Sequence, residues 1–243
     1  MARDTEDDWK AIGDSEPWYG VLSAPKFLAA NITEQAKAEF FDQGVREIDW
    51  AVANIRREDP GFAPRSALDF GSGLGRLSFA MASICDHVVG VDISAGMRAE
   101  AERQKVERGI HNVDFAEALP TGQTFDWINT YIVLQHIVPA KGYEIVRDLL
   151  KSLAPGGWTS IQLPFAHDHR DLTSIQRDTH AYSYDGESAL ALEFKETNVG
   201  EMSMYDYNMN KILFIFIRSG IHNLHLVHTD HGGVHGFWIF GKK

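Results

Sequence analysis

Three glycines alternate with other residues in the segment "ALDFGSGLGRLS", residues 67–78, between a short apolar run and a helical pattern. Glycines at this density cost backbone entropy, so they indicate a turn whose backbone approaches a ligand closely. The dinucleotide pattern G-x-G-x-x-G would need a glycine where Arg76 stands, and no Gly-Lys-Ser/Thr follows as in a P-loop. The segment therefore predicts a ligand-binding turn that differs from two common phosphate-binding patterns.

Two carboxylates flank this turn. Asp69 comes directly before it, and Asp92 ends the next apolar run. A carboxylate before the turn would repel a pyrophosphate, but it suits a ligand that carries an amine or sulfonium charge. An acid at the end of the second strand accepts hydrogen bonds from the ribose hydroxyls of a nucleoside. A phosphate-free nucleoside with a positively charged amino-acid tail is S-adenosylmethionine.

The chain resembles the class I S-adenosylmethionine-dependent methyltransferases over residues 65–165 and in its C-terminal hairpin. "LDFGSGLGRLS" is similar to their first motif, "VVGVDIS" to their acidic motif on the second strand, and "LAPGGW" to the turn before their fifth strand. "EALP" and "FDWINTYIVLQHI" are similar to their third- and fourth-strand region. The order and spacing of these segments imply a Rossmann-like fold with S-adenosylmethionine as the cofactor.

The resemblance also implies which residues hold the cofactor. Asp69 would face its ammonium group, directly or through water, and Asp92 would hold the ribose hydroxyls. Ile93 and Met97 would lie against the adenine, while Arg76 would either pair with the cofactor carboxylate or be a solvated residue of the first helical turn. The other implied positions are Phe70, Gly71, Ser72, Gly73 and Gly75 in the turn, Glu117 and Ala118 at the adenine edge, and Asn129, Thr130 and Gln135 at the methionine end.

The methyl acceptor is predicted by elimination to be a small molecule with a hydroxyl or amine. The leader, with "FFDQG" at 40–44, also resembles that of methyltransferases from carbohydrate-decorating and natural-product pathways, which implies a sugar or natural-product intermediate as the acceptor. "NTYI" stands where similar DNA amino-methylating enzymes carry Asn/Asp/Ser-Pro-Pro-Tyr/Phe, and Cys85 does not follow a proline as a cytosine-C5 nucleophile would. The paired-glutamate loop of protein-arginine enzymes and the Asp/Asp-Asn metal cluster of catechol enzymes are not found. A formal net charge of −11 further disfavours a nucleic-acid partner.

Three histidines are candidate general bases: His136 just past the fourth predicted strand, and His167 and His169 just past the fifth. Asp168 stands between the last two, and a histidine–aspartate pair can supply a base near neutral pH. Each candidate has a structural alternative. His136 would pack at a helix start, and the other two would belong to a polar loop.

Aromatic residues are predicted to line the acceptor pocket. Trp18 and Tyr19 in the N-terminal segment would form a lid over it, or would anchor that segment to the core. The further candidates for contact with the acceptor are Tyr131, Phe165 and Tyr205.

Five histidines near the C-terminus do not predict a metal site. Strand alternation places His225 on the face opposite His228, and no carboxylate set or cysteine completes a ligand cluster. His228 and His231 would instead border the acceptor pocket. The other two are His222 and His235.

The elements that position these residues alternate between strand and helix, which predicts an α/β fold with a mostly parallel sheet between two helical layers and a C-terminal antiparallel β-hairpin. We expect a helical leader over residues 1–64, with a helix at 33–58, and a cofactor-binding domain over 65–243. Strands are predicted at 66–70, 87–93, 113–119, 125–134 and 158–165, helices at 75–84, 94–109, 139–157 and 204–221, and the hairpin at 223–243.

Composition places further bounds on the function. A chain of 243 residues can bury one sizeable core, and its single cysteine, Cys85, excludes a disulfide framework. The sequence shows no signal-peptide pattern and no run of about 20 apolar residues, which favours a cytoplasmic protein without a membrane span. A non-catalytic cofactor-binding subunit and an NAD-linked oxidoreductase are the alternatives, and the oligomeric state is not predicted.

Overall fold

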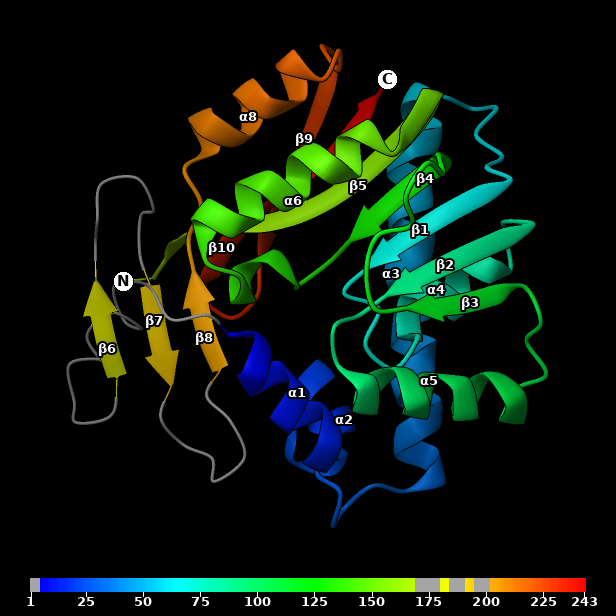
Figure 1. Cartoon of the computed structure of the whole chain (residues 1–243), viewed down its shortest axis with the longest axis vertical. Helices are drawn as coiled ribbons and strands as arrows, with labels where there is room; N and C mark the ends of the chain where they lie inside the picture. Colours follow the sequence, from blue (N-terminus) through cyan, green and yellow to red (C-terminus); the bar gives the residue numbers. More distant parts are fainter. Residues whose placement is uncertain (1–4, 169–179, 184–190, 195–201) are drawn as a thin grey trace.

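A computed structural model describes residues 5–168, 180–183, 191–194 and 202–243 (Figure 1). The elements, in chain order, are α1 (Glu6–Ser15), α2 (Pro17–Val21), η1 (Pro25–Phe27), α3 (Glu34–Glu58), β1 (Ser66–Phe70), α4 (Arg76–Ala82), β2 (His87–Val91), α5 (Ala95–Glu107), β3 (Val113–Ala116), β4 (Phe125–Thr130), η2 (Leu134–His136), α6 (Pro139–Lys151), β5 (Leu153–His167), β6 (His180–Ser183), β7 (Ala191–Phe194), β8 (Met202–Tyr205), α8 (Met209–Arg218), β9 (Leu224–Asp230) and β10 (Val234–Lys242).

The main sheet has the strand order β3-β2-β1-β4-β5-β10-β9. β1 to β5 are mutually parallel, and β10 runs antiparallel to both β5 and β9. The predicted mostly parallel sheet with a C-terminal antiparallel hairpin is therefore confirmed. Because β1 lies between β2 and β4, the chain reverses its direction of winding there, and open α/β sheets bind ligands at the carboxyl ends of the strands beside such a point.

Helices cover both faces of this sheet, as Figure 1 shows. Neighbouring strand residues point to opposite faces, so Ala67 joins the core under α3 and α4, whereas Leu68 joins the core under α6 and α8. The three layers predicted from the alternation of strands and helices are thus present.

The helix predicted at 33–58 is α3, and Thr33 caps it by accepting a hydrogen bond from the Ala36 amide at 3.1 Å. Phe40 and Ile55 on its inner face are fully buried. Trp50 belongs to the same apolar pattern but is 40% exposed and stacks on Trp238, with 5.0 Å between ring centroids. The pattern therefore predicted the helix correctly but did not separate the sheet-facing from the partly solvated positions.

Several predicted boundaries were wrong. β4 ends at Thr130 rather than at 134, because Ile132 adopts a φ of 58° and leaves the extended conformation. Residues 153–157, predicted as the end of a helix, begin β5, where Leu153 pairs with Phe125. A second sheet, β6-β7-β8, was not predicted, and α8 begins at 209 because residues 202–205 form β8.

Candidate functional site

The turn after β1 requires glycine. Gly71, Gly73 and Gly75 have φ values of 74°, 52° and 81°, a region that L side chains rarely adopt. The Gly71 amide donates to the Val91 carbonyl at 2.7 Å, which folds the turn back on β2. A Cβ on Gly71 would lie 2.3 Å from a Val133 methyl carbon. The turn therefore passes the loop after β4 too closely to carry a side chain at this position.

Asp92 ties this turn to the start of α5. Its Oδ2 accepts from the Gly73 amide and its Oδ1 from the Ser94 amide, each at 2.9 Å. Burial raises the pKa of the Asp92 carboxyl, and the two amide hydrogen bonds oppose that shift. A carboxylate oxygen can accept more than one hydrogen bond, so Asp92 keeps acceptor capacity for a ligand hydroxyl.

Asp69 lies in a buried network between β1, α4 and β4. Its Oδ2 accepts from the Ser78 hydroxyl at 2.6 Å, and its Oδ1 accepts from the Asn129 amide at 3.0 Å. The Asn129 Oδ1 in turn accepts from the Ser160 hydroxyl at 2.7 Å. Burial raises the pKa of the Asp69 carboxyl against these hydrogen bonds. Both oxygens thus have protein partners, and a contact with a ligand ammonium stays a prediction.

Arg76 is buried, with 4% of its surface exposed, so a solvated residue is the wrong interpretation. Its guanidinium forms an ion pair with Glu47 of α3 and lies 5.7 Å from the centre of the Phe40 ring. Among the residues that the structure describes, its Nε has no hydrogen-bond partner. Arg76 therefore links α4 to α3 while one of its donors stays free for another group.

The loop after β4 contains a strained residue. Ile132 has a φ of 58°, which a β-branched side chain disfavours. Its amide donates to the Gln162 Oε1 of β5 at 3.0 Å, which helps to hold the backbone there. Such conformations cost about 1–3 kcal/mol each and cluster at functional sites. The residue after Ile132, Val133, lies directly against Gly71 of the glycine turn.

Four buried polar atoms around the turn and this loop have no partner among the described residues: Ser72 Oγ, Arg76 Nε, Thr130 Oγ1 and Gln135 Oε1. Buried polar atoms in folded proteins are nearly always hydrogen-bonded, so each such atom indicates a missing partner. The set offers acceptors for an ammonium group and donors for a carboxylate. The residues present therefore fit the amino-acid end of S-adenosylmethionine.

The predicted adenine positions surround the start of α5. Met97 is buried, and a Cβ on Gly20 of the leader would lie 3.1 Å from its Cε. Glu117 is exposed and pairs with Arg98 at 3.4 Å. The remaining three predicted positions near the turn differ in burial: Phe70 and Ile93 are half-buried, and Ala118 is exposed.

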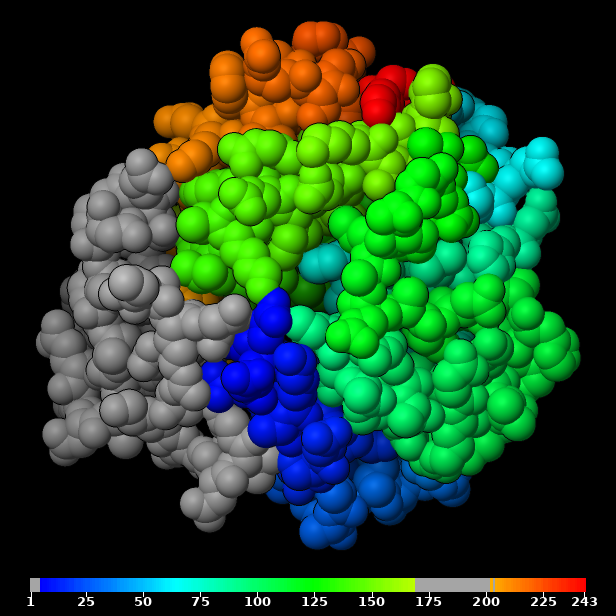
Figure 2. Space-filling model, viewed as in Figure 1, coloured from blue at the N-terminus to red at the C-terminus, as the bar shows by residue number. Residues whose placement is uncertain are grey.

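The leader lies over the carboxyl ends of β2 and β4. The Thr5 hydroxyl donates to the His136 carbonyl at 2.5 Å, and the Trp9 ring lies 4.7 Å from the His136 ring. A Cβ on Gly13 would lie 2.0 Å from the Ser94 Oγ, so α1 packs directly on the start of α5. Figure 2 shows a hollow bordered by the blue leader and by green segments of the sheet domain.

His167 has a partner that the sequence analysis did not identify. Its Nδ1 lies 2.9 Å from the Oδ2 of Asp206, and both side chains are almost fully buried. Asp168, the predicted partner, instead lies 2.7 Å from His235 Nε2 at the surface. Asp206 follows β8, 39 residues from His167, so sequence proximity could not have revealed the pair.

The other two candidate bases differ from His167. The His136 ring lies between Trp9 and the Gln135 amide, whose Nε2 is 3.1 Å from the ring Nε2, as in the packing alternative. His169 lies outside the described residues. The structure thus pairs His167 with a buried carboxylate.

Most of the predicted acceptor-lining aromatics pack on protein. Trp18 is buried edge-on against Phe40 and Phe41, as expected of an anchor, and Tyr19 is half-buried. Tyr131 stacks on Trp238 at 4.3 Å, and burial raises the pKa of its hydroxyl, so it stays protonated. The last two are Phe165, which stacks on Phe237, and Tyr205, which is buried.

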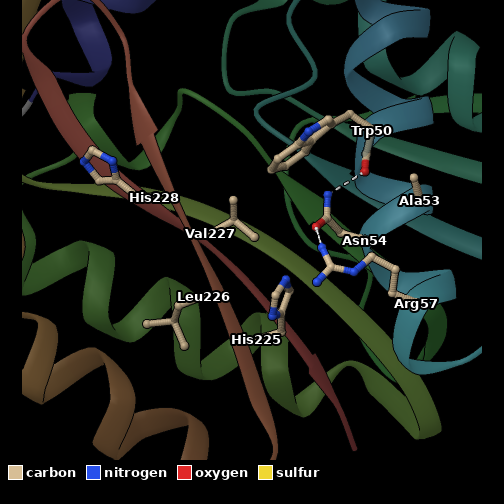
Figure 3. Close-up of a pocket in the computed structure, with 8 residues that line it drawn as sticks. All are labelled: Trp50, Ala53, Asn54, Arg57, His225, Leu226, Val227 and His228. Carbon is tan, nitrogen blue, oxygen red and sulfur yellow. Dashed lines mark hydrogen bonds between the residues drawn. The ribbon is translucent and has the colours of Figure 1, made fainter.

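Two features lie apart from this site. Within the described ranges, no group of three or more histidine, cysteine or acidic side chains could hold a metal ion. A surface hollow of about 510 Å³ lies between α3 and β9 (Figure 3), lined by Trp50, Ala53, Asn54, Arg57, His225, Leu226, Val227 and His228. No predicted cofactor or catalytic residue lines this hollow.

Comparison with known proteins identifies a domain family that matches the middle of the chain. Residues 67–157 match the model of a methyltransferase domain family. Over 101 residues, the chain is 38% identical to the ubiquinone biosynthesis O-methyltransferase of Paraburkholderia xenovorans, covering 39% of this chain and 42% of the relative. The corresponding protein of Paraburkholderia phytofirmans is 35% identical over 103 residues, covering 40% of this chain and 43% of that protein. The match thus spans less than half of these relatives.

Solved structures share the fold over the whole chain. Magnesium protoporphyrin IX methyltransferase from Synechocystis PCC 6803, with bound S-adenosylhomocysteine, covers 99% of this chain and 100% of its own, with 18% identity and a TM-score of 0.65. The N-methyltransferase NodS from Bradyrhizobium japonicum WM9 covers 98% and 99%, with 12% identity and a TM-score of 0.59. Residues 67–157 thus match a methyltransferase domain family, and the chain shares its fold with S-adenosylmethionine-dependent methyltransferases of known structure.

Proposed function

We propose that this protein transfers a methyl group from S-adenosylmethionine to an oxygen or nitrogen atom of a small molecule. The observation that supports it best is the convergence of the glycine turn, Asp92 and the unpartnered polar atoms at the carboxyl ends of β1, β2 and β4. A phosphate-free cationic nucleoside matches this set of groups, whereas a pyrophosphate would meet the Asp69 carboxylate.

In this proposal each part of the cofactor meets a separate group of residues. Asp92 accepts hydrogen bonds from the ribose hydroxyls, and Ile93 and Met97 pack on the adenine. Arg76 and the Ser72 hydroxyl donate to the carboxylate end. Asp69, Asn129, Thr130 and Gln135 surround the ammonium end, and the remaining contacts come from Phe70, Gly71, Gly73, Gly75, Glu117 and Ala118.

The acceptor would bind beside the methionine end, between the loop after β4 and the end of β5. The leader would cover it, with Trp9 and Val21 on the inner side. When bound, the cofactor supplies an electrophilic methyl carbon on a sulfonium. The protein's own part is to orient the acceptor in line with that carbon and to exclude water.

The low identity to curated relatives restricts what they imply about the acceptor. Two relatives named above are O-methyltransferases, and one structural neighbour is an N-methyltransferase. The net charge of −11 supports a small-molecule acceptor over a polyanion. Within the described part of the chain, no helix is long and apolar enough to cross a membrane.

Calorimetric titration with S-adenosylhomocysteine tests the cofactor site. We expect binding by the wild type and a loss of about 1–3 kcal/mol, or about 5–150-fold in affinity, in Asp92→Ala, because the ribose hydroxyls lose a charged acceptor. Asp86→Ala is the matched control, since it removes an exposed carboxylate from the other end of β2 and should bind normally. Equal affinity in both variants would mean that the nucleoside binds elsewhere.

A methyl-transfer assay and thermal unfolding with each ligand separate the two alternatives. A non-catalytic subunit would bind S-adenosylhomocysteine but transfer no methyl group to any acceptor. An oxidoreductase would gain thermal stability with NAD and none with S-adenosylhomocysteine.

A further inference from the structure

Two histidine–aspartate pairs lie near the end of β5, and they differ in burial. The side chains of His167 and Asp206 are 2% and 1% exposed, whereas those of His235 and Asp168 are 26% and 44% exposed. The side chains of a surface pair can hydrogen-bond to water instead of to each other, whereas a pair excluded from water keeps a fixed hydrogen-bonding geometry. The buried pair therefore needs a separate explanation.

The next residue, Tyr207, holds the backbone at Asp206 in place through its amide and its hydroxyl. The Tyr207 amide donates to the Pro164 carbonyl of β5 at 2.9 Å. The Tyr207 hydroxyl lies 2.9 Å from the Leu134 carbonyl and 2.8 Å from the Ile137 carbonyl, which both follow β4. Asp206 is thus fixed between the ends of β4 and β5, the region where the acceptor would bind.

The geometry also defines which nitrogen of His167 can accept a proton. The Asp206 Oδ2 is 2.9 Å from Nδ1, and an ionised carboxylate can only accept, so next to the ionised Asp206 a neutral His167 carries its hydrogen on Nδ1 and its lone pair on Nε2. Nε2 is buried and has no partner among the residues that the structure describes. A buried lone pair without a donor indicates a hydrogen-bond donor that the described residues do not supply, such as a bound acceptor.

We propose that His167 is the general base of the methyl transfer, that Asp206 is the positioning residue that fixes its tautomer, and that the acceptor group is a hydroxyl. This inference rests on the proposed methyltransferase function and adds the substrate class to it. The charge of His235 also lowers the pKa of the Asp206 carboxyl, against the larger effect of burial.

The chemistry of the two acceptor classes favours a hydroxyl. A neutral amine already presents a lone pair and can lose its proton after it is methylated, so it needs no base during attack. A hydroxyl is a weak nucleophile until its proton is removed. Free imidazole titrates near about 6.5 and a phenol near about 10, whereas water has a value of about 15.7, so a phenol is the hydroxyl that imidazole deprotonates most readily.

The step is balanced as follows. His167 Nε2 takes the proton of the acceptor hydroxyl, and the oxygen forms a bond to the methyl carbon. The bond from that carbon to sulfur breaks, with its electron pair going to sulfur. The products are a methyl ether, S-adenosylhomocysteine and a proton on His167, which passes to solvent.

The first test measures the tautomer and needs no acceptor. Histidine labelled with ¹⁵N gives long-range ¹H–¹⁵N correlations, and His167→Asn identifies the His167 signals among the 11 histidines. We expect a neutral ring with its proton on Nδ1 in the wild type and in Asp168→Asn, and a mixture of tautomers in Asp206→Asn. A proton on Nε2 in the wild type would overturn the proposal, whatever the activity.

The second test measures methyl transfer to two phenols, 3,4-dihydroxybenzoate and 4-hydroxybenzoate. We expect turnover of at least one, a fall in kcat of about 10²–10⁴-fold in His167→Asn and Asp206→Asn, and near wild-type rates in Asp168→Asn.

Binding of S-adenosylhomocysteine separates the possible failures. If the wild type does not bind it, the proposed function itself is wrong. If it binds but neither phenol is methylated, the acceptor class is wrong. If phenol turnover is unaffected in the His167 and Asp206 variants, neither residue is part of the proton transfer.

Discussion

The glycine turn at residues 71–75 and the His167–Asp206 pair occupy the carboxyl ends of different strands, and the chain assembles them differently. The backbone hydrogen bonds of the turn stay within residues 71–92, such as the bond from the Gly73 amide to Asp92. The pair joins residues 39 positions apart, and a tyrosine hydroxyl bonded to the segment after β4 holds it in place. One region is local in sequence and the other depends on the packing of the whole domain.

This difference explains why the two regions should respond differently to substitution. We expect substitutions within the turn to act directly, because a residue with a Cβ rarely adopts the left-handed backbone conformation of its glycines. We expect the pair to lose its geometry when a distant packing contact moves Asp206, even though neither His167 nor Asp206 is substituted. Three substitutions test this distinction.

The largest effect is expected from Gly71→Ala. The left-handed φ of 74° costs about 1–2 kcal/mol for a residue with a Cβ, and the contact at 2.3 Å from Val133 adds about 1–3 kcal/mol of overpacking. We expect the free energy of unfolding in urea to fall by about 2–5 kcal/mol. The affinity for S-adenosylhomocysteine should fall as well, because the turn itself moves.

Gly122→Ala is the matched control for this prediction. Its φ of 73° is nearly the same, but a Cβ there would meet nothing within 4 Å. It should lose only the conformational part, about 1–2 kcal/mol, and keep full affinity. Equal losses in the two variants would show that contact with the loop after β4 contributes nothing. The double variant Gly71→Ala/Val133→Ala should recover part of the loss.

The fold around the glycine turn was predictable from sequence for the same reason. The strand at 66–70 and the placement of Asp92 follow from contiguous patterns of apolar residues, glycines and acids, and the structure contains the predicted parallel sheet. Patterns of this kind span few residues, so they can be recognised in a single sequence without an alignment. The partners of Arg76 and His167 could not be predicted, because Glu47 and Asp206 reach them through tertiary packing across 29 and 39 residues.

The strand end at Thr130 shows a second limit. Apolar residues continue to Leu134, so the pattern predicted a longer strand, whereas the backbone at Ile132 turns to a φ of 58°. A β-branched residue gives no local signal for that conformation, since its intrinsic preference is extended. The contact with Gln162 that helps to hold it comes from another strand.

An intermediate effect is expected from Gly142→Ala in α6. A Cβ there would lie 2.0 Å from the Tyr207 hydroxyl. Alanine gains about 1 kcal/mol of helix propensity, but overpacking costs about 1–3 kcal/mol, so the net loss of stability should be at most about 2 kcal/mol. Because Tyr207 adjoins Asp206, methyl transfer should fall while the affinity for S-adenosylhomocysteine is unchanged.

Tyr207→Phe provides the control for that prediction. It removes the nearest atom that the new methyl group would strike but leaves two ring carbons at 2.7 Å, so Gly142→Ala should destabilise the protein less in the Tyr207→Phe background than in the wild type. A double-mutant cycle in urea measures the coupling. If S-adenosylhomocysteine affinity falls together with activity, the two regions are not independent and the comparison above is wrong.

The smallest effect concerns the pH dependence of stability. Burial raises the pKa of Asp206, and the hydrogen bond from His167 and the charges of His167 and His235 lower it, with burial the larger effect. A carboxyl whose pKa is raised in the folded state stabilises the fold while protonated and loses that contribution as the pH rises through the raised pKa. The wild type should therefore lose stability relative to Asp206→Asn as the pH rises from about 4 to 7, since an unfolded aspartate titrates at about 3.9.

Urea unfolding of both proteins across that range measures the difference, with Asp168→Asn expected to track the wild type. A difference that stays constant with pH would mean that the hydrogen bond from His167 fully offsets the burial of Asp206, and that the two histidine–aspartate pairs differ in exposure but not in electrostatic cost.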